Sequence, residues 1–171
     1  MQRFASFAVA LGLSASLAFA APADDHVARG LLALKSMDAV TAMDAFTLAL
    51  EADPHHAVAA YERGRILLKA GEPQEAIADF TTAILTDPAF GRAYARRGEA
   101  KLVLKDGKGA SADFDQAIAV APGDYEVFAV RAAFRLSIGN LAGARSDLES
   151  ARAVADAKTA VAIEAMIGRL K

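Results

Sequence analysis

The sequence repeats itself with a period of 34 residues, and this period limits the possible folds more than any other feature. A period of this length indicates a stacked array, because each unit must bury its apolar face against the next. The columns that keep the spacing are Phe46, Phe80, Phe114 and Leu148; Ala42, Ala76, Ala110 and Ala144; Ala49, Ala83, Ala117 and Ala151; Arg29-Gly30, Arg63-Gly64, Arg97-Gly98 and Arg131-Ala132; Asp53-Pro54, Asp87-Pro88 and Ala121-Pro122.

Each unit is predicted to contain two helices. In the second unit, Gly71 predicts the end of the first helix and Pro73 the first turn of the second. We expect Gly64 to let the two helices meet backbone to backbone, with the Phe80 ring filling the space beside it. Apolar stripes at helical spacing run along both helices: Ala60, Gly64 and Leu67, then Ala76, Ile77, Phe80, Ala83 and Ile84.

These columns resemble those of the tetratricopeptide repeat family, whose unit is a 34-residue helix-turn-helix. The resemblance implies an all-α fold, a right-handed superhelical solenoid in which the end units are the least regular. His26 stands at the early aromatic position of the first unit, and Asp156 replaces the terminal Pro of the last. The repeat region is 21–158, with units 23–56, 57–90, 91–124 and 125–158. Residues 159–171 are predicted to form a C-terminal capping helix, with a membrane-surface helix as the alternative.

Residues 1–20 have the pattern of a secretory signal peptide. Arg3 and the amino terminus precede an uncharged apolar run, which ends in the small-residue exit Ala18-Phe19-Ala20. We therefore expect cleavage between Ala20 and Ala21, and a periplasmic location. An uncleaved membrane anchor is the alternative, since the run nearly reaches the ~20 residues that span a bilayer.

Composition excludes several classes of function. The 171 residues include no Cys, which excludes a disulfide framework, a thiol nucleophile and a thiolate zinc site. The net charge of -2 does not indicate the basic surface that nucleic-acid binding requires. The hydrophobic fraction of 54% is largely Ala, which favours closely packed helices over strands.

Three motifs point towards chemistry, but none completes a catalytic or metal site. The segment 107–112 matches G-x-G-x-x-A, yet it is expected in an inter-helix turn without the strand that a dinucleotide site needs. His55 and His56 are expected to be exposed turn residues. Asp113 and Asp115 lie on a repeat helix with no predicted His or Lys partner. We therefore expect no enzyme activity, no cofactor and no metal.

An Arg and an Asp recur at a fixed separation of 16 residues, one on each helix of a unit. We predict a structural ion pair, with the Arg stem on apolar surface and its head at the carboxylate. A ladder of arginines for an anionic partner is the alternative. In the first unit Ala45 leaves Arg29 without its Asp, and Asp44 is the candidate substitute. The complete pairs are Arg63 and Asp79, Arg97 and Asp113, and Arg131 and Asp147.

The resemblance implies that the first helix of each unit lines a concave groove that binds peptides or partner helices. On that face the middle of the groove is basic with one aromatic anchor, and the C-terminal end is small and apolar. A partner with an acidic segment and an apolar end would fit. The expected partner-binding residues are Tyr61, Arg65, Lys69, Arg92, Arg96 and Glu99. The same face also presents Val27, Leu31, Lys35, Val58, Ala95, Val103, Glu126, Ala129, Ala133 and Leu136.

Some members of this family grip a C-terminal carboxylate with a cluster of basic and amide residues. Arg92 and Arg96 match two basic positions of that cluster, whereas Val27, Leu31 and Glu62 replace its Lys and Asn residues, so the clamp is incomplete. The leading hypothesis is an adaptor or scaffold that is monomeric alone. The alternative is a structural subunit of an envelope assembly, packed through its convex face or its caps.

Overall fold

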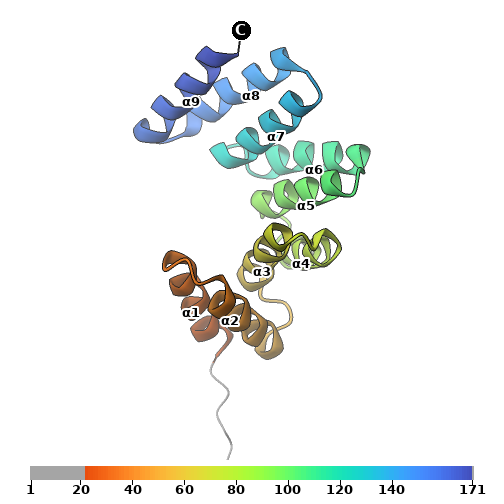
Figure 1. The fold of residues 1–171 in the computed structure, drawn as a ribbon, viewed down its shortest axis with the longest axis vertical. Helices are drawn as coiled ribbons and strands as arrows, with labels where there is room; N and C mark the ends of the chain where they lie inside the picture. The colour runs from red at the N-terminus through yellow and green to blue at the C-terminus, as the bar shows by residue number, and fades with distance from the viewer. Residues whose placement is uncertain (1–21, 171) are drawn as a thin grey trace, which may run out of the picture.

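The computed structural model describes residues 22–170, and the predicted signal peptide lies outside this range. Every regular element in the range is an α-helix, which confirms the all-α prediction. Helix-turn-helix pairs follow one another in chain order along the long axis of the molecule (Figure 1). None of these helices combines the length and the apolar character needed to cross a membrane. The helices are α1 (Ala23–Lys35), α2 (Ala39–Ala52), α3 (Ala57–Ala70), α4 (Pro73–Thr86), α5 (Gly91–Val103), α6 (Gly107–Val120), α7 (Tyr125–Ser137), α8 (Leu141–Val154) and α9 (Ala157–Arg169).

The turn inside each pair passes through one residue with left-handed backbone. Gly71 has φ 85° and Gly139 has φ 75°, so the predicted helix stop at Gly71 is confirmed. The same place in the other two repeats is taken by Met37, with φ 60°, and Lys105, with φ 64°. An L-residue in this conformation costs ~1–2 kcal/mol relative to right-handed backbone, a cost that Gly avoids.

Replacing Lys105 by Gly is therefore expected to stabilise the protein. The Lys105 side chain is exposed, so the substitution removes no packing. Relief of the left-handed strain outweighs the larger backbone entropy of Gly in the unfolded chain, for a net gain of about 0.5–1 kcal/mol. Urea unfolding measures the gain, and Gly139→Ala is the matched control that should lose a similar amount. A loss of stability in Lys105→Gly would contradict the strain argument.

The Phe column forms the core of each repeat. Phe80 is fully buried, and a Cβ added at Gly64 would lie 2.8 Å from one of its ring carbons. Gly64 therefore makes room for the Phe80 ring, as predicted, and its nearest contacts across the helix pair are side-chain atoms rather than backbone. In the fourth repeat Ala132 replaces the Gly and Leu148 replaces the Phe, and both are buried in one cluster. A methyl group is therefore gained where a ring is lost.

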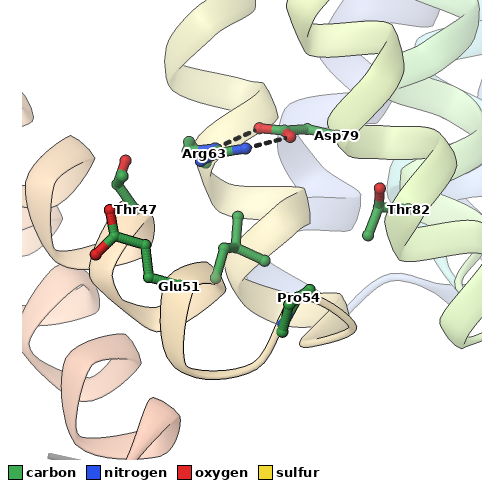
Figure 2. Close-up of a pocket in the computed structure, with 7 residues that line it drawn as sticks. Thr47, Glu51, Pro54, Arg63, Asp79 and Thr82 are labelled. Atoms are coloured by element: carbon green, nitrogen blue, oxygen red, sulfur yellow. Dashed lines mark hydrogen bonds and ion pairs between the residues drawn. The ribbon is translucent and has the colours of Figure 1, made fainter. Parts of the chain in front are cut away.

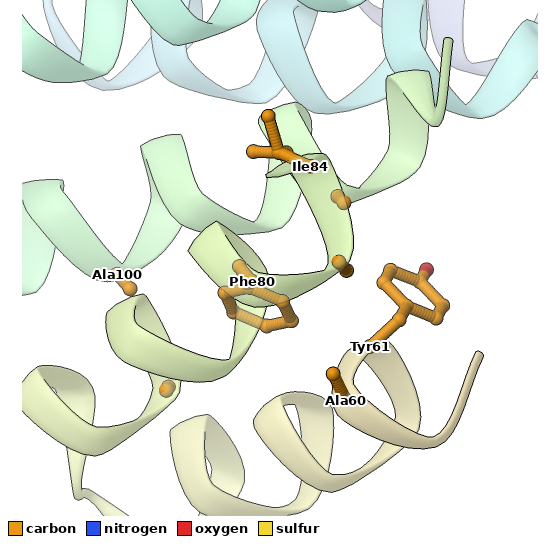
Figure 3. Packing of buried hydrophobic residues seen from close by; sticks show 8 residues of the cluster. Ala60, Tyr61, Phe80, Ile84 and Ala100 are labelled. Carbon is orange, nitrogen blue, oxygen red and sulfur yellow. The ribbon is translucent and has the colours of Figure 1, made fainter. Parts of the chain in front are cut away.

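The cores of neighbouring repeats are joined through alanines. Figure 3 shows Phe80 of α4 beside Ala60 and Tyr61 of α3, with Ala100 of α5 contributing from the next repeat. All four residues are buried, three of them completely. The Ala content of the chain thus reflects contact between helices along a line of small clusters rather than one thick core.

The predicted Arg–Asp pairs are present in the second, third and fourth repeats. Arg63 Nε and Nη2 each donate to Asp79 over 2.7 Å, with bidentate geometry. Arg97 and Arg131 hold Asp113 and Asp147 in the same way, over 2.7–3.1 Å. These carboxylates are buried, so the ladder is structural, as predicted. In residues 22–170 Arg29 forms no ion pair, and Asp44 does not substitute for the missing Asp.

Two of these arginines also join adjacent repeats through their third nitrogen. Arg97 Nη1 donates to the Thr81 hydroxyl over 3.2 Å, and Arg131 Nη1 donates to Asp115 over 2.7 Å. Lys101 Nζ lies 2.7 Å from Asp113, so the expectation that this carboxylate lacks a Lys partner is wrong. The partner comes from the first helix of the same repeat, across the helix pair, and not from along its own helix.

The last helix covers the end of the fourth repeat. It begins at Ala157, two residues before the predicted start at 159, because the Asp156 side chain caps it by accepting from two backbone N–H groups. Hydrogen bonds from Thr159 lower the pKa of Asp156. Ile163 and Ile167 are buried against Leu148 of α8. The α9 side chains therefore close the apolar face that a further repeat would otherwise cover.

Candidate peptide-binding groove

A shallow groove runs across the first helices of successive repeats. Between α3 and α5 it deepens into a hollow of about 220 Å³, lined by Arg65, Lys69, Arg96, Glu99 and Leu68. Four of these five are residues that the sequence predicted for partner binding. Towards α7 a second depression lies beside Arg92, Arg96, Glu126 and Val130. We call this surface, from Arg65 to Val130, the first-helix groove.

Each arginine of the first-helix groove forms an ion pair with a carboxylate of the same chain. Arg65 Nη1 donates to Glu62 over 2.7 Å, and Arg96 Nη1 donates to Glu99 over 2.8 Å. Both pairs have i,i+3 spacing on one helix. The middle of the groove therefore presents positive and negative side chains together, and the prediction that it is basic is wrong because it left out the paired carboxylates.

Arg92 is held across the junction to the fourth repeat. Its guanidinium donates to both carboxylate oxygens of Asp124, and its Nε lies 3.4 Å from Glu126. The hydrogen bond to Asp124 is the main reason that the pKa of Arg92 is raised.

Lys69 is exposed and has no ion-pair partner within residues 22–170, so its charge is open to a ligand.

Tyr61, the predicted aromatic anchor, lies inside the protein. Only 5% of its surface is exposed, and its ring packs on Phe90 at 4.7 Å and on Phe80 at 6.0 Å between centroids. Burial raises the pKa of Tyr61, while the positive charges of Arg96 and Arg65 oppose the shift. The Arg65 guanidinium lies 5.7 Å from the ring centroid, so Tyr61 supports Arg65 from below.

Three residues that the sequence assigned to the groove face are buried. Val27, Tyr61 and Ala95 are spaced by 34 residues, and all three are buried. Tyr61 packs in the core against Phe80 and Phe90. Ala95, in contrast, borders the depression beside Arg92, and the fourth member of the column, Ala129, is half-buried. Sequence reasoning also missed two groove carboxylates, Glu62 and Asp124, as partners of the arginines. The i,i+3 spacing of Glu62 and Arg65 was a detectable signal of the first pair.

The motifs considered for chemistry have structural roles. His56 is half-buried, and its Nδ1 accepts from the Ala59 N–H as an N-cap while Nε2 lies 3.0 Å from Asp24 of the first repeat. The expectation of an exposed turn residue is wrong for His56. The segment 107–112 forms the first turns of α6, where Asp106 caps the Gly109 N–H. Across residues 22–170, no three His, Asp or Glu side chains gather to hold a metal ion.

Solved structures show the same architecture. The chain is 29% identical to the second TPR of Spaghetti (RPAP3) bound to the HSP90 peptide SRMEEVD, with 60% of this chain and 94% of that chain covered and a TM-score of 0.56. The TPR2B domain of yeast Sti1 in a pHsp70 complex is 30% identical, with coverage of 58% and 79% and a TM-score of 0.55.

A third similar structure is the Arabidopsis OM64 TPR domain. It is 26% identical, with 69% of this chain and 98% of that chain covered and a TM-score of 0.63. No curated protein matches the sequence at a significant level. The family model for the tetratricopeptide repeat matches residues 27–89 and 61–125, which together make up more than half of the chain. With its repeated helix pairs and Gly–Phe contacts, the chain belongs to the tetratricopeptide repeat family.

Proposed function

We propose that this protein is a non-catalytic adaptor that holds a segment of a partner protein in the first-helix groove. The observation that carries the proposal is the hollow between α3 and α5, where charged side chains of two repeats converge on one space. The similar domains of Spaghetti and yeast Sti1 are bound to an HSP90 peptide and to pHsp70, which supports a peptide-binding role. The binding residues are Arg65, Lys69, Arg92, Arg96 and Glu99, with Tyr61 supporting Arg65.

The charges of the hollow select a partner segment with an acidic residue at its centre. A partner carboxylate reaches Lys69 without displacing any ion pair, whereas it must compete with Glu62 at Arg65 and with Glu99 at Arg96. Competition of this kind makes the arginines weak sites for an isolated anion. Lys69 is therefore the first contact for an acidic side chain, and the exposed part of Glu99 suits a basic neighbour.

The proposal includes export of the chain as a periplasmic protein. The support is the order of Arg3, the uncharged run and the Ala18-Phe19-Ala20 exit, which is that of a cleaved signal peptide. The exported form would begin at Ala21 and act as a monomer until it meets its partner.

Site-specific photo-crosslinking in cells that produce the protein tests the adaptor role. A photoreactive residue at Lys69 lies in the groove, and one at the exposed Val161 of α9 is the matched control. We expect a discrete crosslinked protein from position 69 and none from position 161. Crosslinks from position 161 alone would favour a subunit packed through its cap and would contradict the adaptor proposal.

The captured partner segment then allows a quantitative test of the groove charges. Lys69→Glu is expected to weaken its binding about tenfold, which corresponds to ~1.4 kcal/mol, because an attraction becomes a repulsion. Lys108→Glu makes the same charge change on a second helix and should leave the dissociation constant within about twofold. Equal effects of the two variants would show that binding does not use the first-helix groove.

A further inference from the structure

The geometry points to a second binding site, on the opposite side of the helix pairs from the first-helix groove. Three hollows of about 320, 390 and 360 Å³ lie along the seam between α2 and α4. They share lining residues, so they form one continuous depression. We call it the α2–α4 cleft, lined in its centre by Thr47, Glu51, Pro54, Arg63, Asp79 and Thr82 (Figure 2).

The cleft contains an open hydrogen-bond donor, Arg63 Nη1. At the next two junctions between repeats, the corresponding arginine nitrogen is bonded within the chain. Arg97 Nη1 donates to Thr81, and Arg131 Nη1 donates to Asp115, always to the second helix of the preceding repeat. At the first junction the corresponding residues are Arg63 and Thr47. Arg63 uses only Nε and Nη2, both on Asp79, and within residues 22–170 its Nη1 has no acceptor.

The Thr47 hydroxyl is also without a partner in the described part of the chain, whereas Thr81 donates to the Ile77 carbonyl over 2.7 Å. Figure 2 shows Thr47 and Glu51 on α2 across the cleft from the Arg63–Asp79 pair. A donor and a hydroxyl thus face the same hollow from two repeats. At the next two junctions the acceptor of the arginine Nη1 is a hydroxyl oxygen, from Thr81, and a carboxylate oxygen, from Asp115.

The open donor selects an extended segment of a partner protein. Arg63 Nη1 is accessible from the cleft and can donate to an oxygen acceptor of a ligand, whereas the carbonyls of a helix are already bonded inside the helix. An extended chain presents its carbonyls outward and reaches into a narrow cleft. The hollows run from Glu75 to Thr86 along α4, or ~16 Å of helix at ~1.5 Å per residue. About five extended residues cover that length at ~3.3 Å each.

The charge around the cleft selects basic side chains in that segment. Residues 36–56 and 71–90, which contain α2, α4 and their flanking turns, carry eight Asp and Glu residues and no Lys or Arg. Glu51 and Glu75 are exposed at the rim, and Leu50, Leu67 and Ala78 supply apolar lining. Successive side chains of an extended chain point in opposite directions. The occupant is therefore a partner segment in which Lys or Arg alternates with apolar residues.

Fluorescence anisotropy with a labelled seven-residue peptide of alternating Lys and Val tests this site on the purified protein. Thr47→Asp places at the first junction the carboxylate that Asp115 supplies to Arg131, so Arg63 Nη1 becomes bonded within the chain. We expect the peptide affinity to fall at least tenfold. Thr81→Asp adds the same charge in the same column at a junction that is already closed, and should leave the affinity within twofold or slightly tighter.

The sign of the Thr47→Asp effect separates the site from general attraction between charges. An added carboxylate strengthens nonspecific binding of a Lys-rich peptide, so unchanged or tighter binding to Thr47→Asp would overturn the proposal. The pair Glu51→Lys and Glu75→Lys should also weaken binding at least tenfold, and Glu149→Lys on α8 is its control. Equal binding of a Glu and Val peptide would likewise overturn it.

The two proposed sites can fail independently. Lys69→Glu, which weakens the partner of the first-helix groove, lies on the other side of the helix pairs and should not weaken the Lys and Val peptide. Thr47→Asp should leave the groove partner unaffected.

Discussion

Asp147→Ala is expected to destabilise the protein by about 3 kcal/mol. The Asp147 side chain is 3% exposed, accepts from Arg131 Nε and Nη2, and lies 2.8 Å from Arg135. Its removal leaves two guanidiniums side by side without their shared carboxylate. Breaking a buried ion pair costs ~3–5 kcal/mol, and the partial exposure of both arginines places this case at the lower end. Thermal unfolding should occur ~6–12 °C lower.

Asp115→Ala is the matched control, because Asp115 contacts the same Arg131 from the preceding repeat. Its side chain is 63% exposed, so water replaces the carboxylate readily. Exposed pairs contribute ~0–1 kcal/mol, and we expect a change of about 0.5 kcal/mol or less. A loss below about 1 kcal/mol for Asp147→Ala would show that burial does not distinguish the two carboxylates, contrary to our interpretation of the Arg–Asp ladder.

Gly98→Ala is expected to cost about 2 kcal/mol, within the ~1–3 kcal/mol range of overpacked cores. The added Cβ would lie 2.7 Å from a ring carbon of Phe114, which is fully buried and has nowhere to move. Gly107→Ala is the control, since a Cβ there meets nothing within 4 Å. That variant should be neutral or gain up to ~1 kcal/mol from helix propensity. Urea unfolding measures both changes.

A second substitution tests whether the Phe ring causes the cost. Phe114→Leu in the Gly98→Ala background recreates the Ala132 and Leu148 combination of the fourth repeat, which is buried and well packed. The double variant should lose less free energy of unfolding than the sum of the two single losses, by ~1 kcal/mol or more. Additive losses would mean that the two positions do not share one space, in conflict with the core described above.

Much of the architecture could be predicted because it depends on local and periodic signals. Gly71 and Pro73 act within one turn, and the Arg63–Asp79 pair follows from a spacing of 16 residues that recurs in three repeats. Residues that act in every unit leave a pattern that one sequence can show. The role of Asp156 was missed because it acts once, as the N-cap of α9, and so leaves no column.

The groove was only partly predictable, because its properties depend on which side chains meet across repeats. Arg65, Lys69, Arg96 and Glu99 do surround one hollow. The charges of Arg65 and Arg96, however, are balanced by Glu62 and Glu99, which the residue-by-residue interpretation did not pair with them.

The sequence by itself determined the helix pairs, their 34-residue register and the buried contacts inside each pair, because helical periodicity and capping act over a few residues. The tertiary structure alone decided how one repeat meets the next. The relative placement of adjacent helix pairs turns Tyr61 inward, and it opens the α2–α4 cleft where Arg63 and Thr47 do not meet. Those contacts depend on packing between whole units, where small differences in side-chain size change which groups touch.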